Sequence, residues 1–472
     1  EALAEHHQSM LVQVGAALHG RGTQTGSARA ATNGVTLHEV RRYYRENKLA
    51  ATGDVTAVRL SSLDSQYVGP IGVGTTVSPP GCTMQGAASF LQPGRARGSS
   101  ARLRSGRACE VGVQSQVWVV FDTGSTNIWV SSDLCKSGAC TKPGRRRYDH
   151  TLSKTYQPPQ HDVLLNIEFG TGKISGPQAI DDFHVGPFTT ENQTFGMIQV
   201  EDGKVFEDVP FEGILGLAFP SMSANGVTPF FDNVIHQKAL PKNEFAFYFS
   251  LDTPAANAVF WGGVDKAFHS GPIEYFAVTD PYYWSIPLLS FRIGGEELLG
   301  PRGGGGGSLL EDGARRRGAG GTWEGPRAVV DTGTTYFTAE DGLFDDVMRR
   351  LPSMYCDDIT EASHPPLTYR LRNSAGEPRD FVLSYTQYMT HSSDSMCSPA
   401  FMKINIPRQH GPAMVLGEVF LRYYFSVFDR GNGDDAQARI GFARASHGSG
   451  VLRRLKHLTK DQPAFSPSSP KI

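Results

Sequence analysis

Two short segments of the sequence each place an aspartate directly after an apolar run. Residues 117–130 read VWVVFDTGSTNIWV, and residues 328–337 read AVVDTGTTYF. One copy is weak evidence for chemistry, because strands often end at turns in which Asp and Gly satisfy the local backbone. Each copy has chance odds of about one in a hundred or less, so two in the same setting are very improbable as unrelated turns. The sequence therefore predicts two related carboxylates, Asp122 and Asp331.

Two carboxylates held close together are suited to moving protons. Both cannot ionise cheaply, so one keeps a proton and the pair titrates with two separated apparent pKa values. A water between them can give a proton to the ionised member while the protonated member donates to a peptide carbonyl. This chemistry needs neither a covalent intermediate nor a metal, so we expect no metal and no cofactor.

The residues that follow each aspartate are suited to supporting it. The glycine of each loop allows a tight bend that brings backbone N–H groups to the carboxylate, and the last hydroxyl can donate to its outer oxygen. The first threonine of each loop can hydrogen-bond to the opposite loop and so hold the two loops together. These supporting residues are Thr123, Gly124, Ser125, Thr332, Gly333 and Thr334.

The elements that position the two loops are expected to be strands from a duplicated unit. Residues 212–219 (EGILGLAF) and 413–420 (AMVLGEVF) each place two apolar residues before a Gly, downstream of their own D-T-G. This repetition indicates internal duplication, with one aspartate per copy meeting at a pseudo-two-fold axis. The 53 Gly and 29 Pro indicate many turns, and helical periodicity is scarce, so the fold class is predicted to be mainly β.

Composition excludes several classes of protein. The 45 basic and 47 acidic residues give a net charge of −2, so no basic field predicts a nucleic-acid partner. There is no run of 18 apolar residues, so we expect no integral membrane span. An even number of cysteines without zinc-type spacing favours disulfides and an oxidising compartment. They fall into the sequence pairs Cys82 with Cys109, Cys135 with Cys140, and Cys356 with Cys397.

The four motifs FDTGSTNIWV, VVDTGTTYF, ILGLAF and VLGEVFLRYYFSVFDR together resemble those of the pepsin-like (A1) aspartic proteases. The resemblance covers about residues 61–445 outside two inserts. It implies two β-rich lobes flanking a deep cleft, with Asp122 and Asp331 as the catalytic pair and peptides as substrates. It also implies the family's two common disulfides, Cys135–Cys140 and Cys356–Cys397, whereas the remaining cysteine pair has no family counterpart.

The resemblance divides the chain into four parts. The first lacks a strong strand pattern, and its basic residues could pair with an acidic cleft at neutral pH. It fits a prosegment that inhibits the enzyme and is removed at acid pH, although a helix needed only for folding is an alternative. The chain starts at Glu1, so a signal has been removed or the true N-terminus is absent. The expected parts are a prosegment (1–60), an N-terminal lobe (61–250, insert about 76–115), a C-terminal lobe (254–445, insert about 300–321) and a disordered basic tail (446–472).

The first insert is rich in Gly, Ser, Arg and Pro, and the strand that leads to Asp122 is expected to resume only at Gln116. The insert reads either as an insertion at a hairpin tip or as a segment that does not belong to the mature message. If the insert is present in the protein and does not loop cleanly from the hairpin, it would interrupt the strand that delivers Asp122.

Residues 166–176 (NIEFGTGKISG) resemble the family's flap, a β-hairpin over the cleft, with Phe169, Gly170 and Thr171 near its tip. Most members carry Tyr where this chain has Phe169, and that hydroxyl bonds the indole of the residue matching Trp129. The change is either a neutral aromatic exchange or a sign of a flap positioned by packing, with a weaker response to transition-state inhibitors.

Phe169, together with YVGPIGVG and DTGSTNIWV, is similar to the plasmepsin IX and X type of apicomplexan parasites. Members of that group resemble maturases, which process precursors of secreted proteins. The resemblance therefore implies a monomeric endopeptidase of the secretory pathway, a secretory organelle, an acidic vesicle or vacuole, or the extracellular space. A digestive or lysosomal cathepsin D-like protease is the alternative within the class. A pepsin-like protein that binds peptides without cutting them is the alternative from another class, although both D-T-G loops are intact.

Two further patterns carry less weight. Asn192 lies in an NQT sequence that matches a glycosylation acceptor. Trp284, Phe230 and Phe231 are expected in the core or in a pocket wall.

Overall fold

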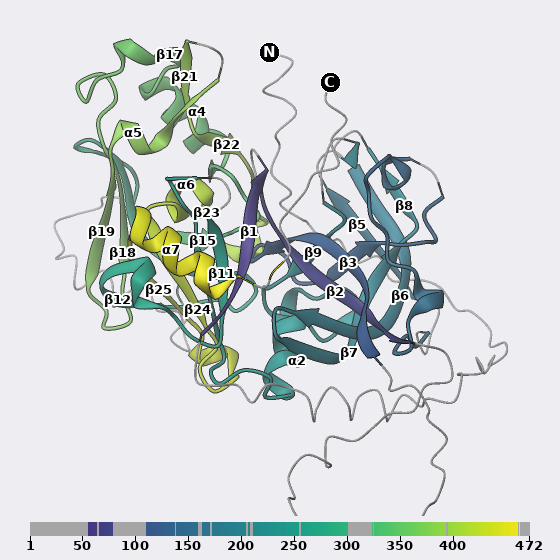
Figure 1. The fold of residues 1–472 in the computed structure, drawn as a ribbon. Coiled ribbons are helices and arrows are strands. Elements are labelled where there is room, and N and C mark those ends of the chain that lie inside the picture. Colours follow the sequence, from purple (N-terminus) through teal and green to yellow (C-terminus); the bar gives the residue numbers. More distant parts are fainter. Residues whose placement is uncertain are drawn as a thin grey trace, which may run out of the picture.

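The computed structural model is built mainly from β-strands (Figure 1). It describes residues 55–63, 66–78, 110–136, 138–158, 163–169, 172–203, 206–207, 211–253, 256–300, 323, 325–392, 395–460 and 462. The expected prosegment up to residue 54, Cys82, Cys109, Gly170 and Thr171 lie outside the described residues. The prediction of a mainly β fold is confirmed.

The largest sheet runs through most of the first half of the chain and returns for its last two strands. Its order is β12-β25-β24-β10-β11-β1-β2-β3-β9-β4-β7-β6-β5, with β8 beside β6. The strands are β1 (Thr56–Leu63), β2 (Gln66–Ser78), β3 (Glu110–Asp122), β4 (Ile128–Ser131), β5 (Leu164–Phe169), β6 (Gly172–Val185), β7 (Phe188–Ile198), β8 (Val200–Asp202), β9 (Gly213–Gly216), β10 (Glu244–Tyr248), β11 (Asn257–Trp261), β12 (His269–Ala277), β24 (Tyr424–Asp429) and β25 (Arg439–Ala445).

Two smaller sheets and five α-helices complete the described fold. The second sheet has the order β19-β18-β13-β15-β23-β16-β22 with β14 beside β13, and the third has the order β17-β21-β20. Their strands are β13 (Ser285–Ile293), β14 (Glu296–Leu299), β15 (Arg327–Val330), β16 (Phe337–Ala339), β17 (Met354–Tyr355), β18 (Leu367–Arg372), β19 (Pro378–Leu383), β20 (Met389–His391), β21 (Met396–Pro399), β22 (Phe401–Lys403) and β23 (Ala413–Leu416). The helices are α2 (Phe230–His236), α4 (Asp341–Arg350), α5 (Tyr385–Tyr388), α6 (Glu418–Leu421) and α7 (Ser449–Leu458).

The same strand arrangement occurs in both halves of the chain. In the first half β3 and β9 are parallel, with Asp122 opposite Gly216, and β4 lies antiparallel to β9 and parallel to β7. In the second half β15 and β23 are parallel, with Val330 opposite Leu416, and β16 lies antiparallel to β23 and parallel to β22. The repeated pairing agrees with the internal duplication that the sequence indicates.

The buried surface of these sheets is rich in aromatic side chains. Trp284, Phe230 and Phe231 are fully buried, as expected. Alternation is clearest in β18, where Leu367, Tyr369 and Leu371 point inward, because successive residues of a strand face opposite sides of the sheet. No helix among the described residues is both long and apolar enough to cross a membrane.

The first insert is shorter than the sequence predicted. β2 and β3 stay in antiparallel register out to the pair formed by Ser78 and Glu110, so the strand resumes at Glu110 and not at Gln116. β2 and β3 form a hairpin, and β3 runs without interruption to Asp122. Residues 79–109 lie outside the described part of the chain. The sequence of residues 110–116 (EVGVQSQ) does not indicate a strand, because an exposed hairpin arm tolerates small and polar residues. Val113 of this arm is 44% exposed.

The boundary of the expected prosegment also needs correction. A prosegment ending at residue 60 would end inside β1, whose residues Thr56–Leu60 pair with β11 and whose residues Ser61–Leu63 pair with β2. Val58 and Leu60 are buried in the main core. The folded body therefore begins at or before Thr56.

The C-terminal tail is not disordered over its whole length, which contradicts the prediction for residues 446–472. α7 forms within it, and Val451 and Leu455 are buried one helical turn apart. The many basic residues of this segment hid the pattern, because they lie on the exposed face of an amphipathic helix. Residues 461 and 463–472 lie outside the described part of the chain.

Candidate active site

Asp122 and Asp331 lie in facing loops at the ends of equivalent strands. Asp122 ends β3 and Asp331 follows β15, and the two residues are 2% and 1% exposed. A methyl group added at Gly124 would overlap the carboxylate of Asp331, and one added at Gly333 would overlap the carboxylate of Asp122. Each carboxylate therefore lies directly over the glycine of the opposite loop, and both aspartates meet where the two halves meet.

Two donors of its own loop hold each carboxylate. The N–H of Gly124 donates to Asp122 Oδ1 at 2.8 Å, and the Ser125 hydroxyl donates to Oδ2. The second loop repeats this pattern, since its glycine N–H donates to Asp331 Oδ1 at 2.7 Å and the Thr334 hydroxyl donates to Oδ2 at 2.6 Å. Each aspartate is thus held by one glycine N–H and one hydroxyl of its own loop.

The first threonines of the two loops form a reciprocal set of hydrogen bonds. Thr123 Oγ1 donates to the carbonyl of Val330 at 2.9 Å and accepts from the N–H of Thr332 at 3.0 Å. Thr332 Oγ1 donates to the carbonyl of Phe121 at 2.7 Å and accepts from the N–H of Thr123 at 3.1 Å. Four buried bonds therefore fix one aspartate loop against the other.

The repeated Gly motifs support the loops from behind. The N–H of Leu217 donates to the carbonyl of Asp122 at 2.8 Å, and the N–H of Glu418 donates to the carbonyl of Thr334 at 2.8 Å. A side chain at Gly216 would overlap the backbone of Thr126, and the same holds for Gly417 and two carbonyls of the second loop. Glycine is therefore required in both motifs by close backbone approach.

Burial raises the pKa of both aspartates. Desolvation raises the pKa of Asp122 well above its usual value, and the negative charge of Asp331 raises it further. Desolvation also raises the pKa of Asp331, against the opposing effect of the Thr334 and Gly333 hydrogen bonds. Two carboxyl groups held this close cannot both ionise cheaply, so the pair can share one proton and offer one acid and one base together.

Two titratable residues near the dyad were not singled out in the sequence. Burial raises the pKa of the Tyr283 phenol, and Tyr282, Asp331 and Asp122 raise it further, which places Tyr283 close to the dyad. Glu418 is 1% exposed, and burial raises its pKa well above the usual value. The only signal for Glu418 was its place in the VLGE motif, and no local pattern marked Tyr283.

The proposed flap is a hairpin in the structure. β5 and β6 pair from Leu164 opposite Pro177 to Phe169 opposite Gly172. The side chain of Phe169 and the two residues at the tip lie outside the described part of the chain. Trp129 is buried and contacts Phe206 edge-on, with ring centroids 6.4 Å apart.

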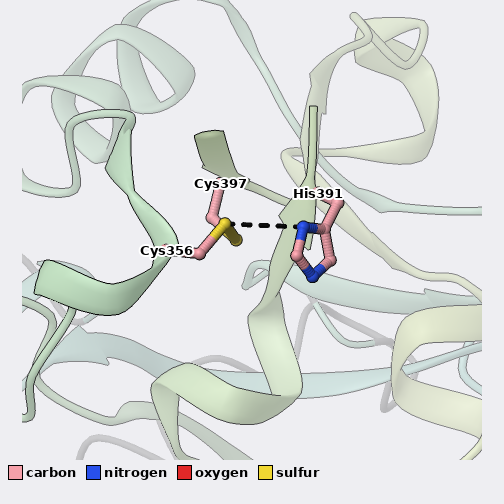
Figure 2. A group of neighbouring side chains, drawn as sticks. All are labelled: Cys356, His391 and Cys397. Carbon is pink, nitrogen blue, oxygen red and sulfur yellow. Dashed lines mark hydrogen bonds between the residues drawn. A yellow bond between two sulfur atoms is a disulfide. The ribbon is translucent and has the colours of Figure 1, made fainter. Parts of the chain in front are cut away.

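The described residues contain two disulfides, Cys135–Cys140 and Cys356–Cys397. Figure 2 shows that His391 lies beside the second one, with its Nδ1 3.5 Å from Cys356 Sγ. This group has the composition of a metal site. Its sulfurs are bonded to each other, however, and metals bind thiolates, so the group does not fit a metal while it is oxidised.

A second group that could hold an ion consists of Asp133, Asp149 and His150. Its ligand atoms already have partners within the protein. His150 Nδ1 bonds Asp133 Oδ1 at 2.9 Å, and Asp149 accepts from the N–H of Thr151 at 3.0 Å. Hydrogen bonds therefore account for the arrangement of this group.

Comparison with known proteins identifies the class that this fold and site define. The model of the eukaryotic aspartyl protease family matches residues 107–445, so the chain belongs to that family. Its β-rich, two-lobed, pepsin-like fold follows from this membership and from the strand arrangement described above.

Individual relatives place the chain within the family. It is 35% identical over 413 residues to aspartic protease 3 of Toxoplasma gondii, covering 86% of this chain and 54% of that protein. It is 32% identical over 376 residues to plasmepsin IX of Plasmodium falciparum (70% and 58% covered) and 34% identical over 336 residues to cathepsin E-B of Xenopus laevis (69% and 75% covered). The chain thus spans little more than half the length of the first two relatives.

Proposed function

We propose that this protein is an aspartic endopeptidase in which Asp122 and Asp331 activate one water between them. The observation that carries the proposal is the reciprocal geometry of the dyad: two buried carboxylates, each over the opposite glycine and each held by a hydroxyl and an N–H. The ionised carboxylate takes a proton from the water, and the protonated one donates to the carbonyl oxygen of the substrate. The hydroxyl and N–H donors keep both groups oriented through this exchange.

The substrate is proposed to be an extended peptide in a cleft between the two lobes, covered by the β5–β6 hairpin. Tyr283 lies near the dyad and is 5% exposed, so its ring can form part of the wall of that cleft. If Phe169 positions the hairpin by packing, Phe169→Tyr will tighten the binding of a statine-type inhibitor, whereas a neutral exchange will leave its affinity unchanged.

Within this class we favour a processing protease of the secretory pathway. The similarity to plasmepsin IX and to aspartic protease 3, together with Phe169, supports this role, and the two disulfides fit an oxidising compartment. An N-terminal prosegment that ends before β1 and is cut at acid pH is part of the proposal, as is a monomeric mature enzyme. The similarity to cathepsin E-B and to pepsin A supports the alternative of a general digestive protease.

Peptide-library cleavage tests this function and separates the alternatives. Wild type and Asp122→Asn are compared from pH 4 to 7.5, with a statine-type inhibitor in parallel. Cleavage by wild type that disappears in the variant supports the dyad. A narrow set of cleaved sequences supports a processing enzyme, and a broad set supports a digestive one.

A folded, prosegment-free wild-type protein that cuts nothing would instead indicate a peptide-binding protein. The intact D-T-G-S and D-T-G-T loops argue against that outcome, because every hydroxyl and N–H that supports the dyad is in place. Intact-mass measurement with and without Asp122→Asn tests self-processing, which should occur only in the active protein.

A further inference from the structure

The segment that follows the family-matched region forms an additional layer over β1. The family match ends at residue 445, and residues 446–460 and 462 are described by the structure. In Figure 1, α7 (yellow) lies next to β1 (purple) and β11, which agrees with their shared apolar cluster. We propose that residues 446–460 together with Gln462, the C-terminal strap, hold β1 in its sheet after the chain is cut on the N-terminal side of that strand.

β1 has an unusual position in the large sheet. It pairs with β11 through Thr56–Leu60 and with β2 through Ser61–Leu63, and within the described residues it is the link between these two strands in the sheet order. β2 pairs in turn with β3, which ends at Asp122. Loss of β1 would therefore divide the sheet beside the strand that positions one catalytic aspartate. A strand next to a cut end is prone to fray unless other contacts hold it.

The apolar face of α7 supplies the first of these contacts. Val451 and Leu455 are 6% and 2% exposed and belong to one cluster with Ala57 of β1, Phe260 of β11 and Phe268. On β1, Ala57 faces this cluster, while its neighbours Val58 and Leu60 belong to the main core. The strand is therefore covered on both faces, and the strap covers one of them.

Gln462 supplies the second contact, directly to the backbone of β1. Its Oε1 accepts from the N–H of Arg59 at 2.8 Å, and its Nε2 donates to the carbonyl of Ala57 at 2.5 Å. One side-chain amide thus bonds two residues along the strand, as the backbone of an added strand would. β11 pairs with this part of β1 along its other edge, so Gln462 satisfies backbone groups on the edge that β11 leaves open.

Polar contacts at the start and in the middle of α7 fix the strap to segments beside β11. The N–H of Gly448 donates to Asp252 at 2.5 Å, and Arg454 Nε donates to Asp265 at 2.7 Å. Tyr248 Oη lies 3.2 Å from His447 Nδ1. The strap is thereby attached to the same body that β1 joins through β11.

The proposal rests on the proposed function in one respect, which is that processing cuts the chain before β1. The test is therefore made in an Asp122→Asn background, in which catalytic activity plays no part. Hydrogen exchange of residues 55–63 is followed in the full chain, and again after limited proteolysis by an added protease has removed the residues before β1. If the proposed protease activity failed, the peptide-cleavage assay would show it without affecting this measurement.

The key variant is Gln462→Ala, and Lys456→Ala on the exposed face of α7 is the control. Loss of one net hydrogen bond predicts exchange of the Arg59 amide about tenfold faster in Gln462→Ala, with a larger effect after proteolysis and none in the control. Exchange in β18 should stay at the wild-type rate. Leu455→Ala gives a second test from the apolar side and should accelerate the same β1 amides. The proposal would be overturned if the Arg59 amide of Gln462→Ala exchanged at the wild-type rate. It would also be overturned if this variant accelerated amide exchange equally in β1 and in β18.

Discussion

Thr123 and Thr332 each place a hydroxyl between the backbone of the opposite loop and its strand, and each accepts a hydrogen bond from the N–H of the other. The two aspartates next to them are thereby held by the same four bonds. A displacement of one loop would therefore displace the other through these bonds. The dyad behaves as one unit, although its two aspartates come from distant parts of the chain.

Removing one of these hydroxyls should affect catalysis and stability together. Thr123→Val leaves a buried N–H of Thr332 and a buried carbonyl of Val330 without their partner, which costs about 1–3 kcal/mol for each unsatisfied group. Urea unfolding and kcat measure the two effects. Thr190→Val is the matched control, because the Thr190 hydroxyl is buried and has no hydrogen-bond partner in the described structure. Equal stability of both variants would contradict the role of the reciprocal bonds.

A single methyl group should disrupt the dyad. In Gly124→Ala the new Cβ would overlap the Asp331 carboxylate, so we expect a loss of kcat of about 10²-fold or more, as for other small displacements of catalytic groups. Gly342→Ala is the control, because that position lies in α4 with open space around it, and it should be neutral or stabilising by about 0.5–1 kcal/mol. Normal kcat in Gly124→Ala would show that the Asp331 carboxylate does not lie over Gly124 as described.

The buried carboxyl of Glu418 should make stability depend on pH. Burial raises its pKa in the folded state, so the folded protein binds this proton more tightly than the unfolded chain does. Its contribution to stability is therefore full below the unfolded pKa of about 4.3 and is lost as pH rises through the higher folded pKa.

Glu418→Gln removes this titration. We expect the free energy of unfolding of wild type to fall more steeply than that of the variant between about pH 4 and 7. Urea unfolding at a series of pH values gives both slopes, and the exposed Glu361→Gln serves as control. Parallel curves for wild type and Glu418→Gln would contradict the raised pKa. A constant offset between them would report only the altered contact with Arg422, 3.3 Å from Glu418.

The two disulfides should differ in their effect on stability. Cys356–Cys397 joins residues 41 apart and Cys135–Cys140 joins residues 5 apart. The loop-entropy relation predicts that replacing both cysteines by Ser costs about 4 kcal/mol for the long loop and about 2 kcal/mol for the short one. Urea unfolding of the two double variants gives the order, and a larger cost for the short loop would show that local packing outweighs chain entropy here.

The sequence by itself determined the chemistry and the class of fold. The pair Asp122 and Asp331 could be predicted because each lies within a short motif of adjacent residues. The mainly β fold followed from turn-rich composition, and the disulfide partners from the resemblance that the motifs carry. Each of these features is carried by short motifs or by composition, which the sequence shows directly.

Only the tertiary structure decided which distant groups surround the dyad. Tyr283 lies two residues before β13, which pairs with β15, and the N–H of Glu418 donates to the carbonyl of Thr334, so tertiary pairing brings both residues toward the dyad. No local pattern records that pairing. The position of β1 was likewise hidden, since its partners are β11 and a glutamine 403 residues away in sequence from Arg59. The prediction of a disordered tail was wrong for α7, because Val451 and Leu455 are buried only by packing within a cluster that includes residues of β1 and β11. Burial and pairing between remote segments arise from the folded chain as a whole, so local sequence could not predict them.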